Sequence, residues 1–316
     1  MIRHRGLFGL ALCLAAGSIF SAAQNAGKID TSVAPVAQSA ASQAEAGHCS
    51  EALAGLARSS GRVADKALEK RVELDGVRCA TLLQRWSQVS DFVRALQRDF
   101  PRDPEALYVA VHAYSDLSTR AAEDLARTAP DSIPALELDA EANEVQGRWD
   151  EAEKDYETIL KQNSRYPGIH FRLARLLLSR PNPPADFQDQ AKKELQAELD
   201  IDPSNAGAEY VSGELARQMQ DFPSAVEHFA KARTLDPDFG DAYLGLGMAL
   251  LSEKKYEDAI VPLEMAVKLE PQNPASHYNL ATAYARTGRK DAAEREFAIQ
   301  QQTAQHGNPA GGSTPQ

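Results

Sequence analysis

The sequence predicts an all-α solenoid in which antiparallel helix pairs stack on one another. Windows between residues 47 and 307 show helical periodicity, and none shows the strict alternation typical of strands. Small residues also recur at an interval of 34 residues, with one longer first interval: the spacings are 39, 34, 34 and 34 residues. The recurring residues are Ala152, Ala191, Ala225, Ala259 and Ala293. A regular interval of this length is typical of repeat architectures, in which each helix pair covers the apolar face of the next.

The first 23 residues have the features of a secretory signal peptide. Arg3 and Arg5 precede an apolar run over residues 7–20, and Ala23 ends a stretch of small residues suited to signal peptidase. The run is shorter than the roughly 20 residues that a spanning helix needs, which argues against a membrane anchor. We therefore expect cleavage after Ala23 and an exported protein, periplasmic or secreted, without a membrane span after cleavage.

The flanking segments differ in composition from the periodic region. Residues 24–46 are mostly Ala, Ser and Gln without apolar periodicity, so we expect a disordered linker there. Residues 47–69 are expected to form N-terminal capping helices. Residues 308–316 are rich in Gly and Pro, and we expect a disordered tail.

Each recurring alanine belongs to a larger pattern of small and bulky residues. A large apolar residue follows four positions later in each case: Tyr156, Leu195, Phe229, Leu263 and Phe297. A small residue precedes at the other side of the helix pair: Ala140, Ala174, Gly213, Gly247 and Ala281. Two helices can cross closely only where both present small side chains, and the bulky residue fills the space beside the crossing.

This pattern resembles the tetratricopeptide repeat, whose small residues fall at positions 8 and 20 and whose proline falls at position 32. Pro203, Pro237 and Pro271 occupy that proline position. The register gives five repeats: 133–166, 167–205, 206–239, 240–273 and 274–307. Upstream, residues 70–132 match less well and are predicted to form two degenerate repeats. The resemblance implies a right-handed superhelix and an exported bacterial protein of this family.

The resemblance also implies where a partner would bind. In this family the first helix of each repeat lines a concave groove, and the matching positions here give a set of candidate groove residues. These are Tyr108, His112, Glu137, Glu141, Glu144, Phe171, Arg172, Arg175, Tyr210, Glu214, Arg217, Leu244, Met248, Tyr278, Asn279 and Arg286. The alternative is that these residues are ordinary solvated helix faces.

No catalytic or cofactor motif occurs in the sequence. There is no GxSxG, HExxH, CxxC or phosphate loop, and His170 and His277 occupy helix-packing positions without ligand-spaced partners. The net charge of −11 makes nucleic acid and anionic membranes poor partners. We therefore expect no enzyme activity, no cofactor and no bound metal.

The function expected from these observations is a protein-binding scaffold or adaptor of the cell envelope. Its groove would hold a partner peptide or protein, in a process such as pilus, secretion or outer-membrane assembly. The alternative is a regulatory subunit of an envelope enzyme, such as a peptidase or glycosyltransferase. The sequence names no partner and leaves the oligomeric state open.

Two cysteines, Cys49 and Cys79, remain after the predicted cleavage. In an oxidising compartment they are expected to form a disulfide, whereas the alternative is a pair of small buried thiols. Counting thiols in the unfolded, unreduced protein tests this directly. We expect none to react with a thiol reagent before reduction and two to react afterwards; two reactive thiols at the outset would exclude the bridge.

Overall fold

The computed structural model describes residues 33–306, which contain fifteen helices and no strand. The predicted all-α solenoid class is therefore confirmed. The predicted signal peptide at 1–23 and the predicted tail at 308–316 lie outside the described residues. The chain divides into two compact parts, an N-terminal unit up to Glu123 and a C-terminal unit from Asp124.

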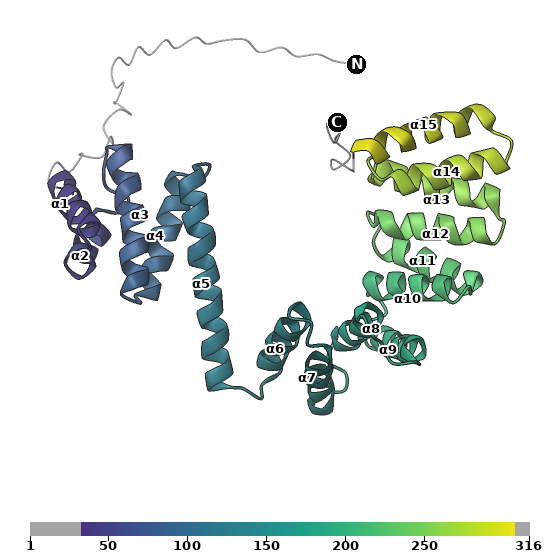
Figure 1. Cartoon of the computed structure of the whole chain (residues 1–316), viewed down its shortest axis with the longest axis horizontal. Coiled ribbons are helices and arrows are strands. Elements are labelled where there is room, and N and C mark those ends of the chain that lie inside the picture. The colour runs from purple at the N-terminus through teal and green to yellow at the C-terminus, as the bar shows by residue number, and fades with distance from the viewer. Residues whose placement is uncertain (1–32, 307–316) are drawn as a thin grey trace, which may run out of the picture. The chain divides into compact units, whose positions relative to one another are not determined.

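The N-terminal unit contains two helix pairs and most of one long helix (Figure 1). Its helices are α1 (Val33–Glu45), α2 (Cys49–Ser59), α3 (Lys66–Leu82), α4 (Trp86–Asp99) and α5 (Pro104–Thr128), the last of which crosses the boundary. A disulfide between Cys49 and Cys79 joins α2 to α3, as expected from the sequence. This covalent link and a shared apolar core hold the two pairs together.

The predicted linker at 24–46 is wrong for the residues that the structure describes, because residues 33–45 form α1. Ala37, Ala40, Ala41 and Ala44 are buried on one face of this helix. Opposite them lies Gly55 of α2, where an added Cβ would lie 2.8 Å from the Cβ of Ala40. Alanine alone suffices at so close a crossing, and a helix without large apolar residues has the composition of a linker.

Two further predictions for this unit need correction. The expected capping segment at 47–69 contains α2 and the first turn of α3, and α2 pairs with α1 instead of closing the end alone. The degenerate repeat expected over 104–132 contains one continuous helix, α5, in place of a pair. A helix pair would need a turn within this segment. The residues from Ser118 to Arg120 include no glycine or proline, and no residue of α5 has a positive φ, the conformation found in the short turns of the other helix pairs.

In six of the seven helix pairs within residues 33–306, the turn between the two helices contains one residue with a positive φ. Three of these turns use glycine and three use a larger residue in the left-handed region. The residues are Gly47, Gln84, Gly147, Gln220, Lys254 and Gly288. The exception is the pair α8–α9, whose connection contains the proline-rich insert near Pro183 and is anchored by Arg180, which binds Asp150 and Glu153.

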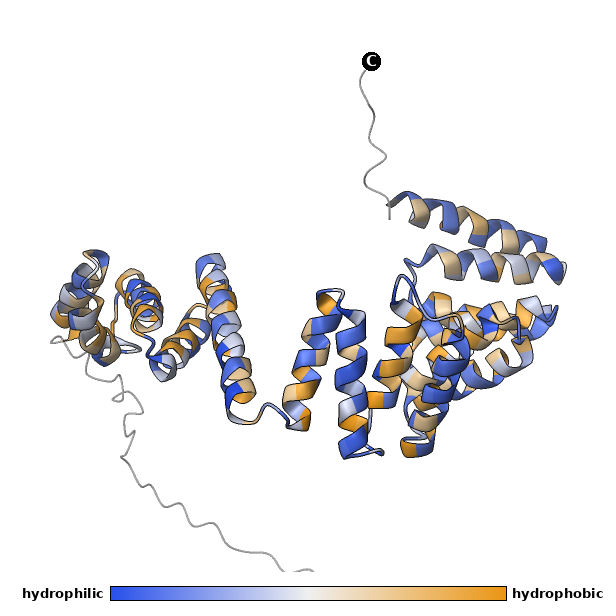
Figure 2. Cartoon of the chain, turned by 60° about the horizontal axis from the view of Figure 1, so that its bottom comes forward, coloured by the Kyte–Doolittle hydropathy of each residue, from blue (hydrophilic) through white to orange (hydrophobic). Residues whose placement is uncertain are grey.

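The C-terminal unit is a stack of five helix pairs, one in each predicted repeat (Figure 1). Its pairs are α6 (Ile133–Val145) with α7 (Trp149–Gln162), α8 (Ile169–Ser179) with α9 (Phe187–Ile201), α10 (Ala206–Gln218) with α11 (Phe222–Leu235), α12 (Gly240–Ser252) with α13 (Tyr256–Leu269), and α14 (Pro274–Arg286) with α15 (Lys290–His306). Apolar and polar residues are segregated to different sides of many of these helices (Figure 2).

Phe229 shows how consecutive pairs are joined. Its ring is fully buried between Gly213 of its own pair and Gly245 of the next. A Cβ added at either glycine would lie closer than 3.0 Å to the ring. The two glycines therefore leave the space for one bulky ring, which packs against its own helix pair on one side and the next pair on the other.

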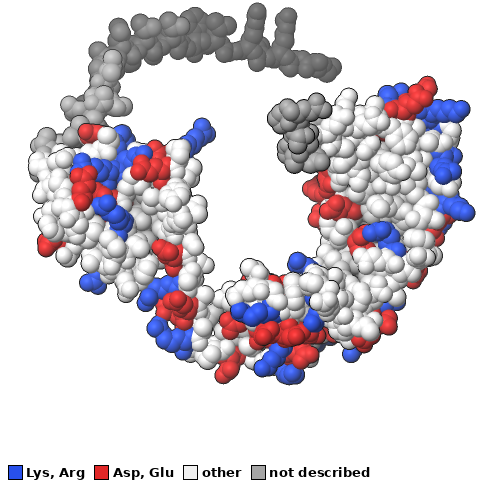
Figure 3. Space-filling view, in the orientation of Figure 1, with Lys and Arg blue, Asp and Glu red and all other residues white. Residues whose placement is uncertain are grey.

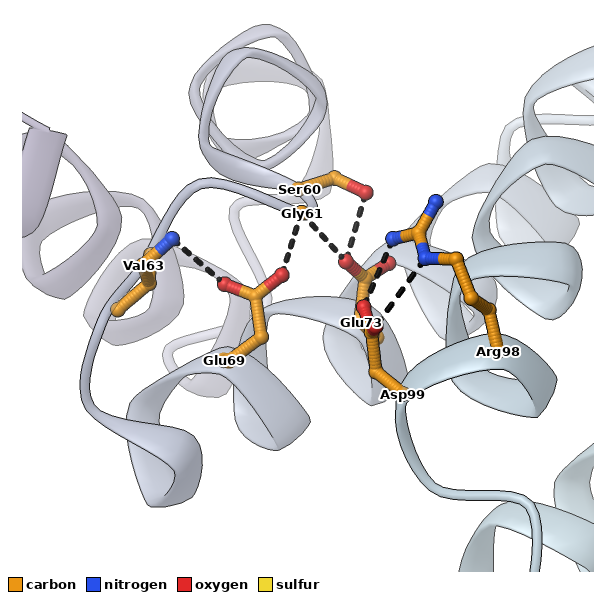
Figure 4. A network of polar contacts seen from close by, with 7 residues as sticks. All are labelled: Ser60, Gly61, Val63, Glu69, Glu73, Arg98 and Asp99. Carbon is orange, nitrogen blue, oxygen red and sulfur yellow. Dashed lines mark hydrogen bonds and ion pairs between the residues drawn. The ribbon is translucent and has the colours of Figure 1, made fainter. Parts of the chain in front are cut away.

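Two buried glutamates hold the loop between α2 and α3 (Figure 4). Glu69 accepts hydrogen bonds from the backbone N–H of Gly61 and of Val63, the latter at 2.9 Å. Glu73 accepts from the Ser60 hydroxyl at 2.6 Å and from the Gly61 N–H at 3.1 Å. Its Oε2 has no partner, and burial, reinforced by the neighbouring Glu69, raises the pKa of Glu73 to about 7.

This pKa makes the stability of the protein depend on pH. The folded state holds the Glu73 proton more tightly than the unfolded chain, whose carboxyl has the ordinary pKa of 4.5. The contribution of Glu73 to stability is therefore greatest below pH 4.5 and falls as pH rises towards 7.

We expect Glu73→Gln to stabilise the protein at pH 8 by about 1–3 kcal/mol, because the amide needs no proton to remain neutral when buried. The gain should shrink as the pH falls to 4.5, and chemical denaturation across this range measures it. Glu69→Gln is the matched control and should destabilise at every pH, since a single amide oxygen cannot replace the two carboxylate oxygens that accept hydrogen bonds from the backbone N–H groups of Gly61 and Val63. A loss of stability in Glu73→Gln at pH 8 would contradict this account.

Three of the repeats contain a histidine–glutamate pair at equivalent positions. His170 lies 2.6 Å from Glu194, and His277 lies 2.6 Å from Glu296, with the histidine on the first helix in both cases. The repeat at 206–239 has the reverse order, with Glu209 on the first helix and His228 on the second, again at 2.6 Å. Where these two positions hold a histidine and a glutamate, the pair therefore forms in either order.

We expect the double change Glu209→His with His228→Glu to retain wild-type stability, because it recreates the order found at His170–Glu194 and His277–Glu296. Each single change places like groups together and should cost about 1–2 kcal/mol. Urea unfolding of the four proteins measures the coupling. The exposed pair Lys161 and Glu157 provides a control cycle with a coupling of roughly 0.5 kcal/mol or less; equal coupling in both cycles would contradict the prediction.

Candidate functional site

The first helices of the last three repeats enclose an open hollow in the C-terminal unit. Its volume is about 590 Å³, and α10, α12 and α14 supply most of its lining. Four predicted groove residues meet there: Arg217, Met248, Tyr278 and Asn279. Leu251 and Thr282 complete the same wall. The hollow thus combines apolar side chains with polar groups on adjacent first helices.

The polar side chains that line this hollow differ in whether they retain a hydrogen-bonding group for a ligand. The Arg217 guanidinium binds both carboxylate oxygens of Glu214, at 2.7 and 3.1 Å, so the two charges neutralise each other. Asn279 donates to the backbone oxygen of Ala275 at 2.8 Å, which leaves its own side-chain oxygen as an acceptor. Tyr278 is 54% exposed, with its ring 5.9 Å from that of Phe297. Asn279 and Tyr278 are therefore the groups best placed to meet a ligand.

Several other predicted residues are engaged with one another on the first two repeats of this unit. Arg172 binds Glu141 at 2.8 Å, and Glu144 accepts a hydrogen bond from Tyr156 at 2.5 Å. Burial and Glu144 together raise the pKa of Tyr156. Red and blue side chains are correspondingly interspersed in the lower part of the space-filling view (Figure 3). The charged candidates of these two repeats thus largely satisfy one another and their neighbours.

The remaining candidates of this unit lie against neighbouring side chains. Tyr210 packs between Phe229 and Phe239, with ring centroids at 5.7 and 4.8 Å, and Leu244 packs against the same core. Burial raises the pKa of Tyr210 to about 12.

Three aromatic or basic candidates and one further glutamate also have close neighbours. Arg175 stacks over Phe171 at 5.8 Å, and Arg286 stacks over Tyr256 at the same distance. Glu137 accepts a hydrogen bond from Tyr166 at 3.4 Å.

The last two candidates belong to the N-terminal unit. Tyr108 and His112 of α5 are exposed neighbours, with ring centroids 4.4 Å apart, and line a separate groove beside α3. Sequence reasoning missed the α3 side of this groove, including Leu74 and Asp75, because it placed a repeat boundary at residue 70 inside that helix. The helical spacing of Leu74, Val77, Arg78 and Thr81 was the available signal.

Over residues 33–306, no cluster of three or more His, Cys, Asp or Glu side chains is arranged to hold a metal ion. Within the same range, no helix combines the length and apolar character required to span a bilayer.

Comparison with protein families identifies the helix pairs. A model of the tetratricopeptide repeat matches residues 140–206 and 210–264, and a second model of the TPR repeat matches residues 247–288. The helix pairs over residues 140–288 are tetratricopeptide repeats. A TPR relative, small glutamine-rich tetratricopeptide repeat-containing protein 2 of Mycosarcoma maydis, is 33% identical over 66 residues. That match spans 21% of this chain and 19% of the relative.

Solved TPR structures share the fold of the repeats. A MamA double mutant (RS-1) superposes with a TM-score of 0.51 at 16% identity, covering 56% of this chain and 97% of the other. MamA from residue 41 onward of Desulfovibrio magneticus RS-1 gives a TM-score of 0.50 at 17% identity, covering 55% and 96%. At such low identity the likeness concerns the TPR fold alone.

Proposed function

We propose that this TPR protein is a non-catalytic scaffold that binds a partner protein on the first-helix face of its C-terminal unit. The observation that carries the proposal is the hollow lined by α10, α12 and α14, with Met248, Leu251 and Tyr278 as apolar contacts. The Asn279 oxygen, which accepts no hydrogen bond from the described residues, can receive a backbone N–H of an extended segment. Aromatic and apolar anchors beside one directional polar group are typical of peptide recognition.

We further propose that the protein works in the cell envelope, where its partner belongs to an assembly such as a pilus, a secretion system or outer-membrane machinery. The sequence at 1–23 has the features of an export signal. The disulfide between Cys49 and Cys79 supports an oxidising compartment, because such bonds persist there and are rare in the cytosol.

Site-specific photo-crosslinking in cells that express the full chain tests the binding face. A photoreactive residue at Met248 or Asn279 should give a discrete crosslinked species, whereas one at Glu227 or Val261, exposed on second helices, should give none. Mass spectrometry of the adduct then identifies the partner and its compartment. Equal crosslinking from both sets, or none from the first-helix positions, would contradict the proposal.

A further inference from the structure

A second groove lies in the N-terminal unit, between α3 and α5. It has a volume of about 830 Å³, and its lining includes the apolar side chains of Leu74, Val77, Val109 and Ala113. All of its lining residues precede residue 117, so the groove belongs to this unit alone and lies outside the repeats matched by the family models. Its size is that of a binding site and not of a packing defect.

Large apolar side chains at this groove remain in contact with water. Leu82 is 70% exposed and Tyr108 is 66% exposed, although both line it. The two helices begin side by side, since Lys70 near the start of α3 binds Asp103 and Glu105 at the start of α5. A channel between neighbouring helices with an apolar floor suits the ridge of a third helix.

The basic residues that line the groove are already paired. Lys70 lies 2.8 Å from Asp103 and 2.9 Å from Glu105, and Arg71 lies 2.5 Å from Glu45. Arg78 binds one oxygen of Asp75 at 2.9 Å. The positive charges of this lining are thus neutralised within the unit.

Two acidic residues of the lining keep a carboxylate oxygen available to a partner. Asp75 is 7% exposed; its Oδ1 binds Arg78, whereas its Oδ2 receives no hydrogen bond from the described residues. Burial raises the pKa of this carboxyl, and the charges of Arg78 and Arg71 offset part of that effect. Asp116 is exposed and forms no ion pair with any residue in the range 33–306. The other titratable groups that line the groove from α5 are Glu105, Tyr108 and His112.

We propose that the groove between α3 and α5 binds a basic amphipathic helix of a partner protein. Its apolar side chains would cover Leu74, Val77 and Val109, and its Lys or Arg side chains would lie beside Asp75 and Asp116. The stretch of α5 from Glu105 to Asp116 corresponds to roughly three turns, which sets the length of the bound helix. This inference is independent of the proposed scaffold face in the C-terminal unit.

Fluorescence anisotropy with the full mature chain tests the proposal. The probes are two labelled 14-residue helical peptides with the same leucine stripe, one with lysine and the other with glutamate at the polar positions. We expect the lysine peptide to bind at least tenfold more tightly and to weaken as salt is raised. Equal binding of the two peptides, or binding of neither, would overturn the proposal.

Variants locate the binding. Asp116→Lys, a change at an exposed position, should weaken the lysine peptide at least tenfold while leaving the circular dichroism spectrum unchanged; Val109→Glu should do the same through the apolar floor. Met248→Glu in the C-terminal unit is the control and should leave this affinity unaltered, although it should abolish crosslinking at the scaffold face. No effect of Asp116→Lys, or displacement of the peptide by a small amphipathic cation at equal concentration, would contradict a helix-binding groove.

Discussion

The close crossing of two helices within each pair is the constraint on which this fold depends. Gly76 meets Phe92, Gly213 meets Phe229, and Gly247 meets Leu263, and an added Cβ at any of these glycines would lie nearer than 3.0 Å to the facing side chain. In all three cases the bulky residue follows the glycine by 16 positions, so one small-to-large pattern specifies the pair in both units. Stacking then follows, because a pair with this narrow crossing cannot cover both of its apolar faces alone.

The sequence predicted the fold best where this pattern is complete. From Ile133 onward each predicted repeat contains one helix pair, because small and bulky residues alternate at positions that only a hairpin brings together. The prediction failed at α1, where alanines alone form the buried face, and at α5, where the turn residue is missing. Helix α1 depends on its contacts with other helices, and α5 continues because no residue breaks it. The repeat spacing carries information on neither of these two features.

The candidate site was predictable in outline but not in its chemistry. The register brought Met248, Tyr278 and Asn279 onto adjacent first helices, and these line one hollow. It could not indicate that Arg172 is bound by Glu141, or that Arg217 is bound by Glu214. Whether a charged side chain is available to a partner depends on distances of a few ångströms between helices, which spacing along the chain does not define.

The pair of Glu209 and His228 has the reverse order of the equivalent pairs in two other repeats. The repeats at 167–205 and 274–307 place histidine on the first helix, yet the distance between imidazole and carboxylate is 2.6 Å in all three repeats. In these repeats the contact is therefore kept while the order of the two residues varies. Residues bound by such internal pairs support the stack, and the side chains left for a partner are those that packing does not use. Under our two proposals these are Asn279 and Tyr278 in one unit and the exposed Asp116 in the other.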